Sequence, residues 1–270
     1  MAFEFKFAVP DKVRDAIRNR LYEIEAVYDV RVLYAAESGS RAWGFASADS
    51  DFDVRFVYVH RQDWYLESLL KRTKDTIEND VQPTPVGKLD VCGWDLAKAL
   101  DLYRNSNASI FEWLDSPIQY LEEGNVASRL FWMRADVCNP YRLWHHYFGM
   151  VGSAIKRFEE RRTVKAWLYI LRPLLMTMWV EQYRTPPPMR LDKVMDEVVS
   201  ATVRRAIVEV VEAKEDGKEN DAFEPPAMLG DYVREGVERA KQLDPRFPKP
   251  VAQPDFGRFF RQALEETWVK

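Results

Sequence analysis

The stretch ESGSRAWGFASADSDFDVRFVYV, residues 37–59, decides the fold class of this chain. A turn at Gly39 and Ser40 follows the apolar strand VRVLYAA, and the pair Asp51 and Asp53 opens a second strand, DVRFVYVH. Successive residues of a strand face opposite sides, so the two carboxylates share one face. The stretch therefore predicts a sheet with an acidic site beside a tight turn.

Two carboxylates on one face repel each other, and a divalent cation removes that repulsion. Hard Mg²⁺ or Mn²⁺ prefers one or two carboxylates, with water and substrate phosphates as the other ligands. Gly39 and Ser40 precede RAWGFA, a segment that can turn as a helix and offer amides and a hydroxyl to a phosphate. The alternative is that Asp51 closes a turn and Asp53 is a solvated strand residue, since aspartate is common at turns.

A third carboxylate lies further along the chain, in KLDVCGW. Asp90 falls on a strand whose neighbours Leu89 and Val91 face the core. We expect Asp90 to accept a proton from an incoming hydroxyl or to bind a second metal ion. Asp95 is the competing candidate, but WDLAKAL indicates that it caps a helix.

Charged residues surround the aspartate pair. Arg55 has the parity of Asp51 and Asp53, so it can temper their mutual repulsion or touch a phosphate, and a solvent-facing arginine is the alternative. Arg41 beside the turn is a second candidate for a phosphate contact. For Glu37 we expect a structural hydrogen bond.

A second polar group lies on a long apolar helix. In KAWLYILR, Lys165, Tyr169 and Arg172 are four and three residues apart, so they share one helical face. The preceding AIKRFEERRTVK is a local basic surface that suits a nucleic-acid backbone. In both cases the alternative is a helix face that simply meets water.

The composition is that of an ordinary soluble protein, with 47% hydrophobic and 30% charged residues among 270 and a net charge of -4. Two cysteines and three histidines build neither a disulfide framework nor a zinc cluster of the usual spacing. We therefore expect a cytoplasmic protein. The most apolar run, AWLYILRPLLMTMWV, is too short to span a bilayer and predicts a buried helix rather than a membrane partner.

The patterning changes near residue 125. Before it, a helix with an apolar stripe precedes strands that alternate with helices; after it, the periodic segments are helical, with exposed loops expected at RTPPPM, EAKEDGKENDAFEPP and DPRFPKPVAQPD. The expected fold class is α+β: a mixed-sheet core followed by an all-helical C-terminal domain. We expect a catalytic domain over residues 1–125 and a helical domain over residues 126–270 that closes the nucleotide cleft.

The motif GSRAWGFASADSDFD resembles the signature of the DNA polymerase β nucleotidyltransferase superfamily. More narrowly, the segments ESGSRAWG, SDFDVRFVYV, DWYL, GWDLAKAL, EWLDSPIQY, LYILRPLL and TPPPM are similar to the YcgL/RlaP family of predicted nucleotidyltransferases, some of which are associated with RNA ligases and RNA repair. The resemblance runs from about Leu33 to Leu191.

This resemblance implies transfer of a nucleoside monophosphate from a nucleoside triphosphate, with release of pyrophosphate. It implies divalent metal ions, Mg²⁺ or Mn²⁺, at Asp51, Asp53 and Asp90, which are also the catalytic residues. The superfamily often uses a lysine and a tyrosine of the helical domain on the triphosphate. The expected nucleotide-binding residues are Gly39, Ser40, Arg41, Lys165, Tyr169 and Arg172.

The acceptor is left open between an RNA end, a protein hydroxyl and a small molecule, and the basic segment favours RNA. A protein acceptor would make the chain an adenylylating enzyme. A nucleotide-binding regulatory module without turnover is the alternative from another class, and the presence of all three aspartates weighs against it.

Overall fold

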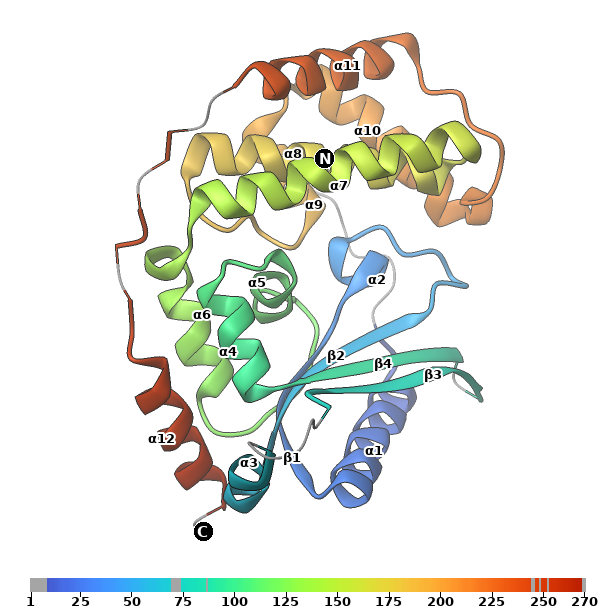
Figure 1. Cartoon of the computed structure of the whole chain (residues 1–270). Coiled ribbons are helices and arrows are strands. Elements are labelled where there is room, and N and C mark those ends of the chain that lie inside the picture. The colour runs from blue at the N-terminus through green and yellow to red at the C-terminus, as the bar shows by residue number, and fades with distance from the viewer. Residues whose placement is uncertain are drawn as a thin grey trace.

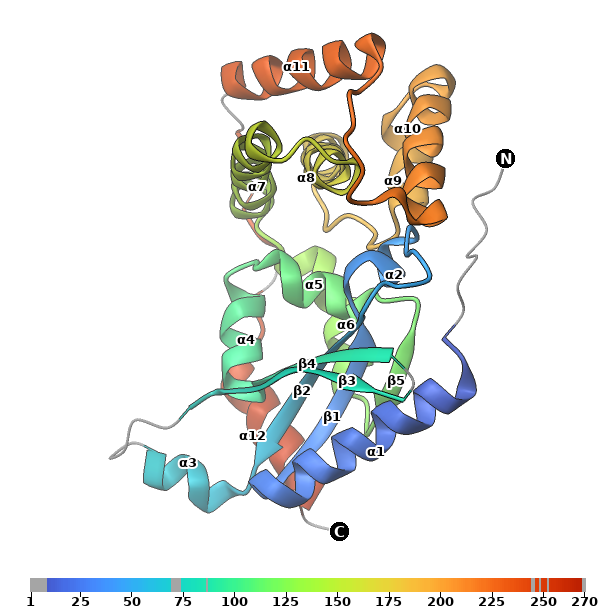
Figure 2. The same cartoon turned by 90° about the vertical axis from the view of Figure 1, so that its right-hand side faces the viewer.

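The computed structural model describes residues 9–68, 74–85, 87–243, 246–247, 249–251 and 253–268. Two parts lie one above the other (Figures 1 and 2). The sheet part holds the strands, the helices α1 to α6 and the returning helix α12, and the helical part holds α7 to α11. The short helices α2 and α5 lie at the end of the sheet part that faces the helical part.

One mixed sheet forms the base of the molecule, in the order β3-β4-β2-β1-β5. Its strands are β1 (Val30–Glu37), β2 (Phe52–His60), β3 (Thr76–Thr84), β4 (Gly87–Asp95) and β5 (Gln119–Glu122). Only β2 and β4 pair in parallel among the described strands, and the other pairs are antiparallel. The end of β1 and the starts of β2 and β4 therefore meet at one end of the sheet.

One face of the sheet is covered by α1 (Asp11–Tyr28), as Figure 2 shows. The helix buries a stripe spaced at three and four residues, as the sequence predicts: Val13, Ile17, Leu21 and Ile24. It packs on alternate residues of the strands, including Phe56 and Tyr58 of β2 and Val91 of β4. The side chains at the intervening positions of β2 and β4, which include Asp53 and Asp90, therefore lie on the face of the sheet away from α1.

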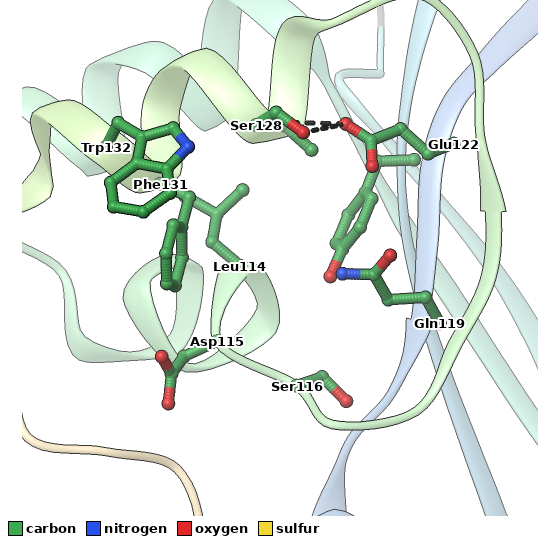
Figure 3. A pocket seen from close by; sticks show the side chains of 10 residues that line it. Leu114, Asp115, Ser116, Gln119, Glu122, Ser128, Phe131 and Trp132 are labelled. Carbon is green, nitrogen blue, oxygen red and sulfur yellow. Dashed lines mark hydrogen bonds between the residues drawn. The ribbon is translucent and has the colours of Figure 1, made fainter.

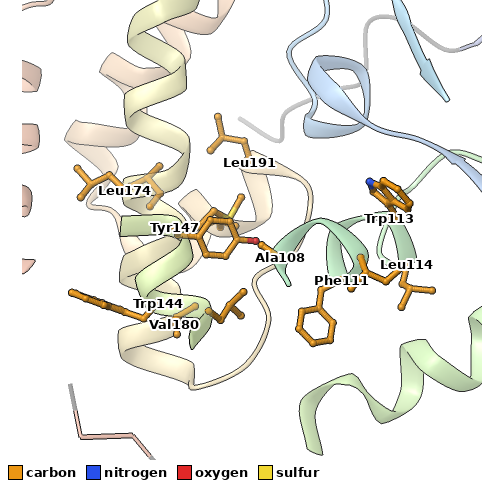
Figure 4. Packing of buried hydrophobic residues seen from close by; sticks show 14 of the residues in the cluster. Ala108, Phe111, Trp113, Leu114, Trp144, Tyr147, Leu174, Val180 and Leu191 are labelled. Carbon is orange, nitrogen blue, oxygen red and sulfur yellow. The ribbon is translucent and has the colours of Figure 1, made fainter. Parts of the chain in front are cut away.

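The other face is covered by helices of the sheet part. These are α4 (Leu96–Arg104), α5 (Ala108–Leu114) and α6 (Val126–Val137), with α3 (Gln62–Ser68) at one end and α2 (Gly39–Trp43) at the other. The core beneath them continues into the helical part without a break. Figure 4 shows this junction, where Ala108 of α5 lies beside Tyr147 of the helical part.

The helical part is built around two long antiparallel helices, α7 (Pro140–Glu160) and α8 (Val164–Tyr183). Smaller elements surround them: α9 (Leu191–Val198), α10 (Ala201–Ala213), the π-helical turn η1 (Lys214–Lys218) and α11 (Ala227–Gln242). The chain then runs back down the molecule to α12 (Phe256–Trp268), which lies beside α4 (Figure 1). The indole of Trp268 donates to the carbonyl oxygen of His60 at 2.9 Å.

The α+β class, with helices following the sheet, is confirmed. Within the described residues no helix is long and apolar enough to cross a membrane. One expectation is wrong in part: the stretch beginning at residue 212 was expected to be an exposed loop, but α10 continues into η1, and Lys214 is 1% exposed. The domain boundary at residue 125 stays a prediction, and α12 lies with the sheet part although it follows that boundary.

Candidate active site

Two aspartates on neighbouring strands form the centre of the site. Asp53 on β2 and Asp90 on β4 are register partners, because the two strands start at the same end of the sheet. One guanidinium nitrogen, Arg55 Nη2, lies 3.3 Å from Asp53 Oδ1 and 2.7 Å from Asp90 Oδ2. Arg55 shares the face of Asp53, as expected, but the second carboxylate that it contacts is Asp90 and not Asp51.

The glycine turn lies directly against Asp53. Gly39 has a φ of +61°, a conformation that glycine adopts freely and other residues rarely do. A Cβ atom at this position would lie 1.9 Å from Asp53 Oδ2. The amide of Ser38 also donates to the carbonyl oxygen of Asp53 at 2.7 Å. The turn and the aspartate therefore form one unit that only glycine permits at position 39.

The protonation of Asp53 reflects this crowding. Burial raises the pKa of Asp53 to about 6; Arg55 works against the shift, while the carboxylates of Asp90 and Asp51 add to it. The side chains of Asp53 and Asp90 are nevertheless 26% and 29% exposed, so a substrate can reach them.

Glu37 supports the turn from below. It is fully buried, and its Oε1 accepts from the amide of Asp53 at 3.0 Å while its Oε2 accepts from the hydroxyl of Tyr120. Burial raises the pKa of Glu37 to about 7. The structural hydrogen bond expected for Glu37 is thus confirmed.

The other turn residues hold the loop that leads into β2. Arg41 is 4% exposed, and its Nη2 donates to the carbonyl oxygen of Ser50 at 2.9 Å. Its guanidinium also lies over the ring of Phe52, 4.3 Å from the centroid. The hydroxyl of Ser40 donates to Ser50 Oγ at 3.3 Å and is partly exposed. Arg41 therefore holds the loop, whereas Ser40 keeps part of its surface exposed. A phosphate contact of either residue stays a prediction.

Two lysines of the helical part approach the same loop. Lys165 Nζ lies 3.2 Å from Glu219 Oε1, and Lys214 Nζ lies 3.0 Å from Glu219 Oε2. Burial opposes the charge of Lys165, but Glu219 and, more weakly, Asp51 raise its pKa. Burial lowers the pKa of Lys214, and Glu219 counteracts this. The hydrogen bond to Ser47 is the main cause that lowers the pKa of Asp49 in the loop, and the two ammonium groups lower it further.

The three residues predicted on α8 have different surroundings. Lys165 is 46% exposed, and Tyr169 packs edge-on against Trp43 of α2 at 5.6 Å. Arg172 is 3% exposed, lies over the Trp43 ring and pairs with Glu112 of α5 at 3.0 Å. All three lie on the side of α8 that faces the sheet part. Arg172 is buried where the two parts pack together.

The donor set at the aspartates suits a hard divalent cation. Mg²⁺ is commonly held by one or two carboxylates together with substrate phosphates. Asp53 and Asp90 offer two accessible carboxylates that face the same cation, which in this structure is the guanidinium of Arg55. Asp51 stands just before β2, with Lys88 Nζ 4.0 Å from its Oδ1. Across the described ranges, no three or more His, Cys, Asp and Glu side chains form a ready metal-binding group.

A family model described as "RNA repair pathway DNA polymerase beta family" (RlaP) matches residues 13–262. The chain belongs to this family. It is therefore a nucleotidyltransferase of the polymerase β class.

Two further proteins resemble this RlaP-family chain. The uncharacterized protein YcgL of Bacillus subtilis (strain 168) is 34% identical over 263 residues, which is 95% of this chain and 98% of the relative. A nucleotidyltransferase-like protein from Exiguobacterium sibiricum 255-15, of known crystal structure, is 12% identical, with a TM-score of 0.34 over 85% of this chain and 74% of the other.

Two hollows in the described part of the RlaP-family chain border its sheet. The smaller, of about 220 Å³, lies at the β5 edge between Tyr34, Asp115, Glu122 and Trp132 (Figure 3), and its lining includes no basic residue. The larger, of about 690 Å³, opens beside Asp90 and Arg55 and reaches Trp43, Trp94 and Arg172. Of these two hollows, only the larger is lined by an aspartate of the site, Asp90.

Sequence reasoning missed several residues around the site. Lys214 was not identified because it lies in an acidic, glycine-containing stretch that is typical of a loop. Glu112 and Trp94 were also not identified, although EWLDSPIQY and GWDLAKAL stood among the motifs of the family resemblance. For Trp94 a signal was present: it has the strand parity of Asp90.

Proposed function

We propose that this protein transfers a nucleoside monophosphate from a nucleoside triphosphate to a hydroxyl group at an RNA end, and releases pyrophosphate. The observation that carries the proposal is the pairing of Asp53 with Asp90 on parallel strands, in contact with the Gly39 turn. An acidic centre beside a phosphate-binding turn is what phosphoryl transfer needs, because that chemistry depends on positioning and charge.

The turn would bind the phosphates, and the aspartates would bind the metal ion. The hydroxyl of Ser40 and the amides at Gly39 bind the phosphates that leave as pyrophosphate, and Lys165 adds positive charge on that side. Asp51, Asp53 and Asp90 would hold Mg²⁺ or Mn²⁺. When bound, the ion supplies positive charge that neutralises the phosphates.

Asp90 also accepts the proton of the acceptor hydroxyl. A bond then forms between that oxygen and the α-phosphorus, and the bond from the α-phosphorus to the bridging oxygen breaks. Arg55 holds Asp53 and Asp90 in register until substrate arrives.

Several observations favour RNA as the acceptor. The family description refers to RNA repair. The basic side chains at the end of α7 and after it are exposed, namely Lys156, Arg157, Arg161 and Arg162. Exposed cations suit a phosphate backbone, although Arg162 already lies 2.9 Å from Glu224.

The test is incubation of the purified protein with each labelled triphosphate, Mg²⁺ or Mn²⁺, and a pool of RNA. We expect labelled RNA and stoichiometric pyrophosphate, both lost in Asp53→Asn. The matched control is Asp101→Asn, an exposed α4 aspartate paired with Arg104. Label on the protein itself would point to adenylylation instead, and bound but intact triphosphate would overturn the enzymatic proposal.

A further inference from the structure

The larger hollow continues the acidic face of the sheet. Its floor is β4, where Asp90, Cys92 and Trp94 alternate with the buried Leu89 and Val91 and so point to the same side. At a rise of about 3.3 Å per residue, this floor extends roughly 13 Å from Asp90 to Trp94. A ligand on it can thus reach from the aspartate to the indole.

Three tryptophans from three elements surround this floor. Trp94 of β4 packs on Trp113 of α5, with ring centroids 3.8 Å apart and a tilt of 30°. Trp43 of α2 also lines the hollow and lies beneath the guanidinium of Arg172. Trp43 and Trp94 are only partly buried, so each keeps surface open to the hollow. Partly open aromatic rings are the usual stacking surface for unpaired bases.

The remaining wall is polar and comes from the helical junction. Ser109, Glu112 and His146 line it together with Arg172. Glu112 already accepts from the hydroxyl of Tyr147 at 2.9 Å, which fixes its carboxylate. Arg172 is 3% exposed, and among the described residues its Nε has no hydrogen-bond acceptor, while its Nη2 lies 3.0 Å from Glu112 Oε1. The wall therefore places a fixed carboxylate and a guanidinium beside the hollow.

The hollow opens on the Asp90 side of the site. Asp90 and Arg55 line it, and it meets the turn only at Ser38, whereas Ser40, Asp51 and Lys165 do not line it. In an in-line displacement the attacking oxygen and the leaving oxygen stand on opposite sides of the phosphorus. If pyrophosphate leaves toward the Gly39 turn, the acceptor hydroxyl must come from the direction of Asp90.

We propose that this hollow binds the unpaired terminal nucleoside of the RNA acceptor, with its base against Trp94 and its hydroxyl at Asp90. The inference rests on the proposed function for the identity of the acceptor. A volume of about 690 Å³ lies within the range of small-ligand sites and has room for one nucleoside, but a paired base would bring its partner into the walls. Stacking on tryptophan is tolerant of sequence, so the site selects an unpaired end rather than a particular base.

The test measures binding and not transfer, so it keeps its meaning even if no transfer is found. A short labelled single-stranded RNA and, separately, a non-hydrolysable triphosphate are titrated into wild type, Trp94→Ala and Trp94→Phe. We expect Trp94→Ala to weaken RNA binding about tenfold or more, with triphosphate binding unchanged, and Trp94→Phe to restore most of it. A blunt duplex of the same sequence should bind the wild type more weakly than the single strand.

The opposite pattern, weaker triphosphate binding with RNA binding unchanged, would overturn the proposal and place the donor base in the hollow. Unchanged binding of both ligands would reduce Trp94 to a packing residue and also overturn it. Ser109→Phe provides a second variant, because it fills the hollow and leaves the indole in place. It should weaken RNA binding as Trp94→Ala does, and normal RNA binding by a folded Ser109→Phe variant would contradict the proposal. If the wild type binds RNA as expected but transfers no nucleotide, the result would count against the proposed function and not against this inference.

Discussion

Gly39 and Asp53 lie so close that the smallest side chain does not fit between them: a Cβ atom at position 39 would be 1.9 Å from Asp53 Oδ2. We expect Gly39→Ala to displace the carboxylate and to abolish nucleotidyl transfer. The positive φ adds a backbone cost of about 1–2 kcal/mol, so the variant should fold with a modestly lower melting temperature. Pyrophosphate release and thermal unfolding measure the two effects separately.

Gly44 is the matched control for this substitution. Its φ of +99° is also left-handed, but no heavy atom lies within 4 Å of a Cβ built there. Gly44→Ala therefore carries the backbone strain without the clash and should retain activity. If both variants lost activity to the same extent, strain in the turn and not displacement of Asp53 would be the cause.

Arg55 holds Asp53 and Asp90 together through one nitrogen, at 3.3 and 2.7 Å. In Arg55→Gln the two carboxylates lose this neutralisation, so the protein should be less stable without a divalent cation. An ion bound there replaces the missing charge. We therefore expect Mg²⁺ to raise the melting temperature of Arg55→Gln by more than it raises that of the wild type.

An exposed arginine provides the comparison. Arg61 pairs with Asp29 at 2.9 Å on the surface, and Arg61→Gln should respond to Mg²⁺ as the wild type does. A melting temperature of Arg55→Gln that does not respond to Mg²⁺ would show that these two carboxylates do not hold the ion.

Lys165 is the accessible member of the lysine pair that shares Glu219. We expect Lys165→Ala to raise the KM for the nucleoside triphosphate about 10- to 100-fold, since a hydrogen bond to a charged group contributes about 1.5–3 kcal/mol. Steady-state kinetics with saturating RNA would measure this. Lys241→Ala removes a surface lysine paired with Glu238 and should leave the KM unchanged. A KM that is equal in both variants would remove Lys165 from the nucleotide site.

Local periodicity accounts for what the sequence predicted well. The helical stripe of α1 and the parity of Asp53 and Arg55 follow from spacing alone, and the structure confirms both. The cap at Asp95 is also confirmed, because its side chain accepts from the amide of Ala97 at 2.8 Å. These features depend on neighbours within a few residues, which a sequence displays directly.

Features that depend on long-range pairing could not be predicted in this way. Asp53 and Asp90 meet because β4 pairs in parallel with β2, and no local pattern specifies that register. Lys214 is buried because its ammonium finds Glu219 and lies over the ring of Phe45, which comes from the other part of the chain. Its own sequence context, rich in charge and glycine, is typical of an exposed loop.

Asp95 gives the protein a pH dependence that is separate from the active site. It is 1% exposed and accepts from the hydroxyl of Tyr65 at 2.6 Å. Burial raises its pKa to about 6, whereas an unfolded chain has an aspartate pKa of about 3.9. Between these values the folded protein keeps a proton that the unfolded chain has lost, so this group's contribution to stability falls as pH rises from about 4 to 6.

Asp95→Asn removes that titration and keeps both the helix cap and an acceptor for Tyr65. The free energy of unfolding, measured in urea at several pH values, should therefore fall with pH more steeply in the wild type, by up to about 1.4 kcal/mol per pH unit between pH 4 and 6. His60 acts in the opposite direction, because burial lowers its pKa to about 4 and its contribution rises with pH up to about 6.5. That contribution is present in both proteins and cancels in the difference. Parallel curves for the two proteins would show that Asp95 is already ionised at pH 4 in the folded state.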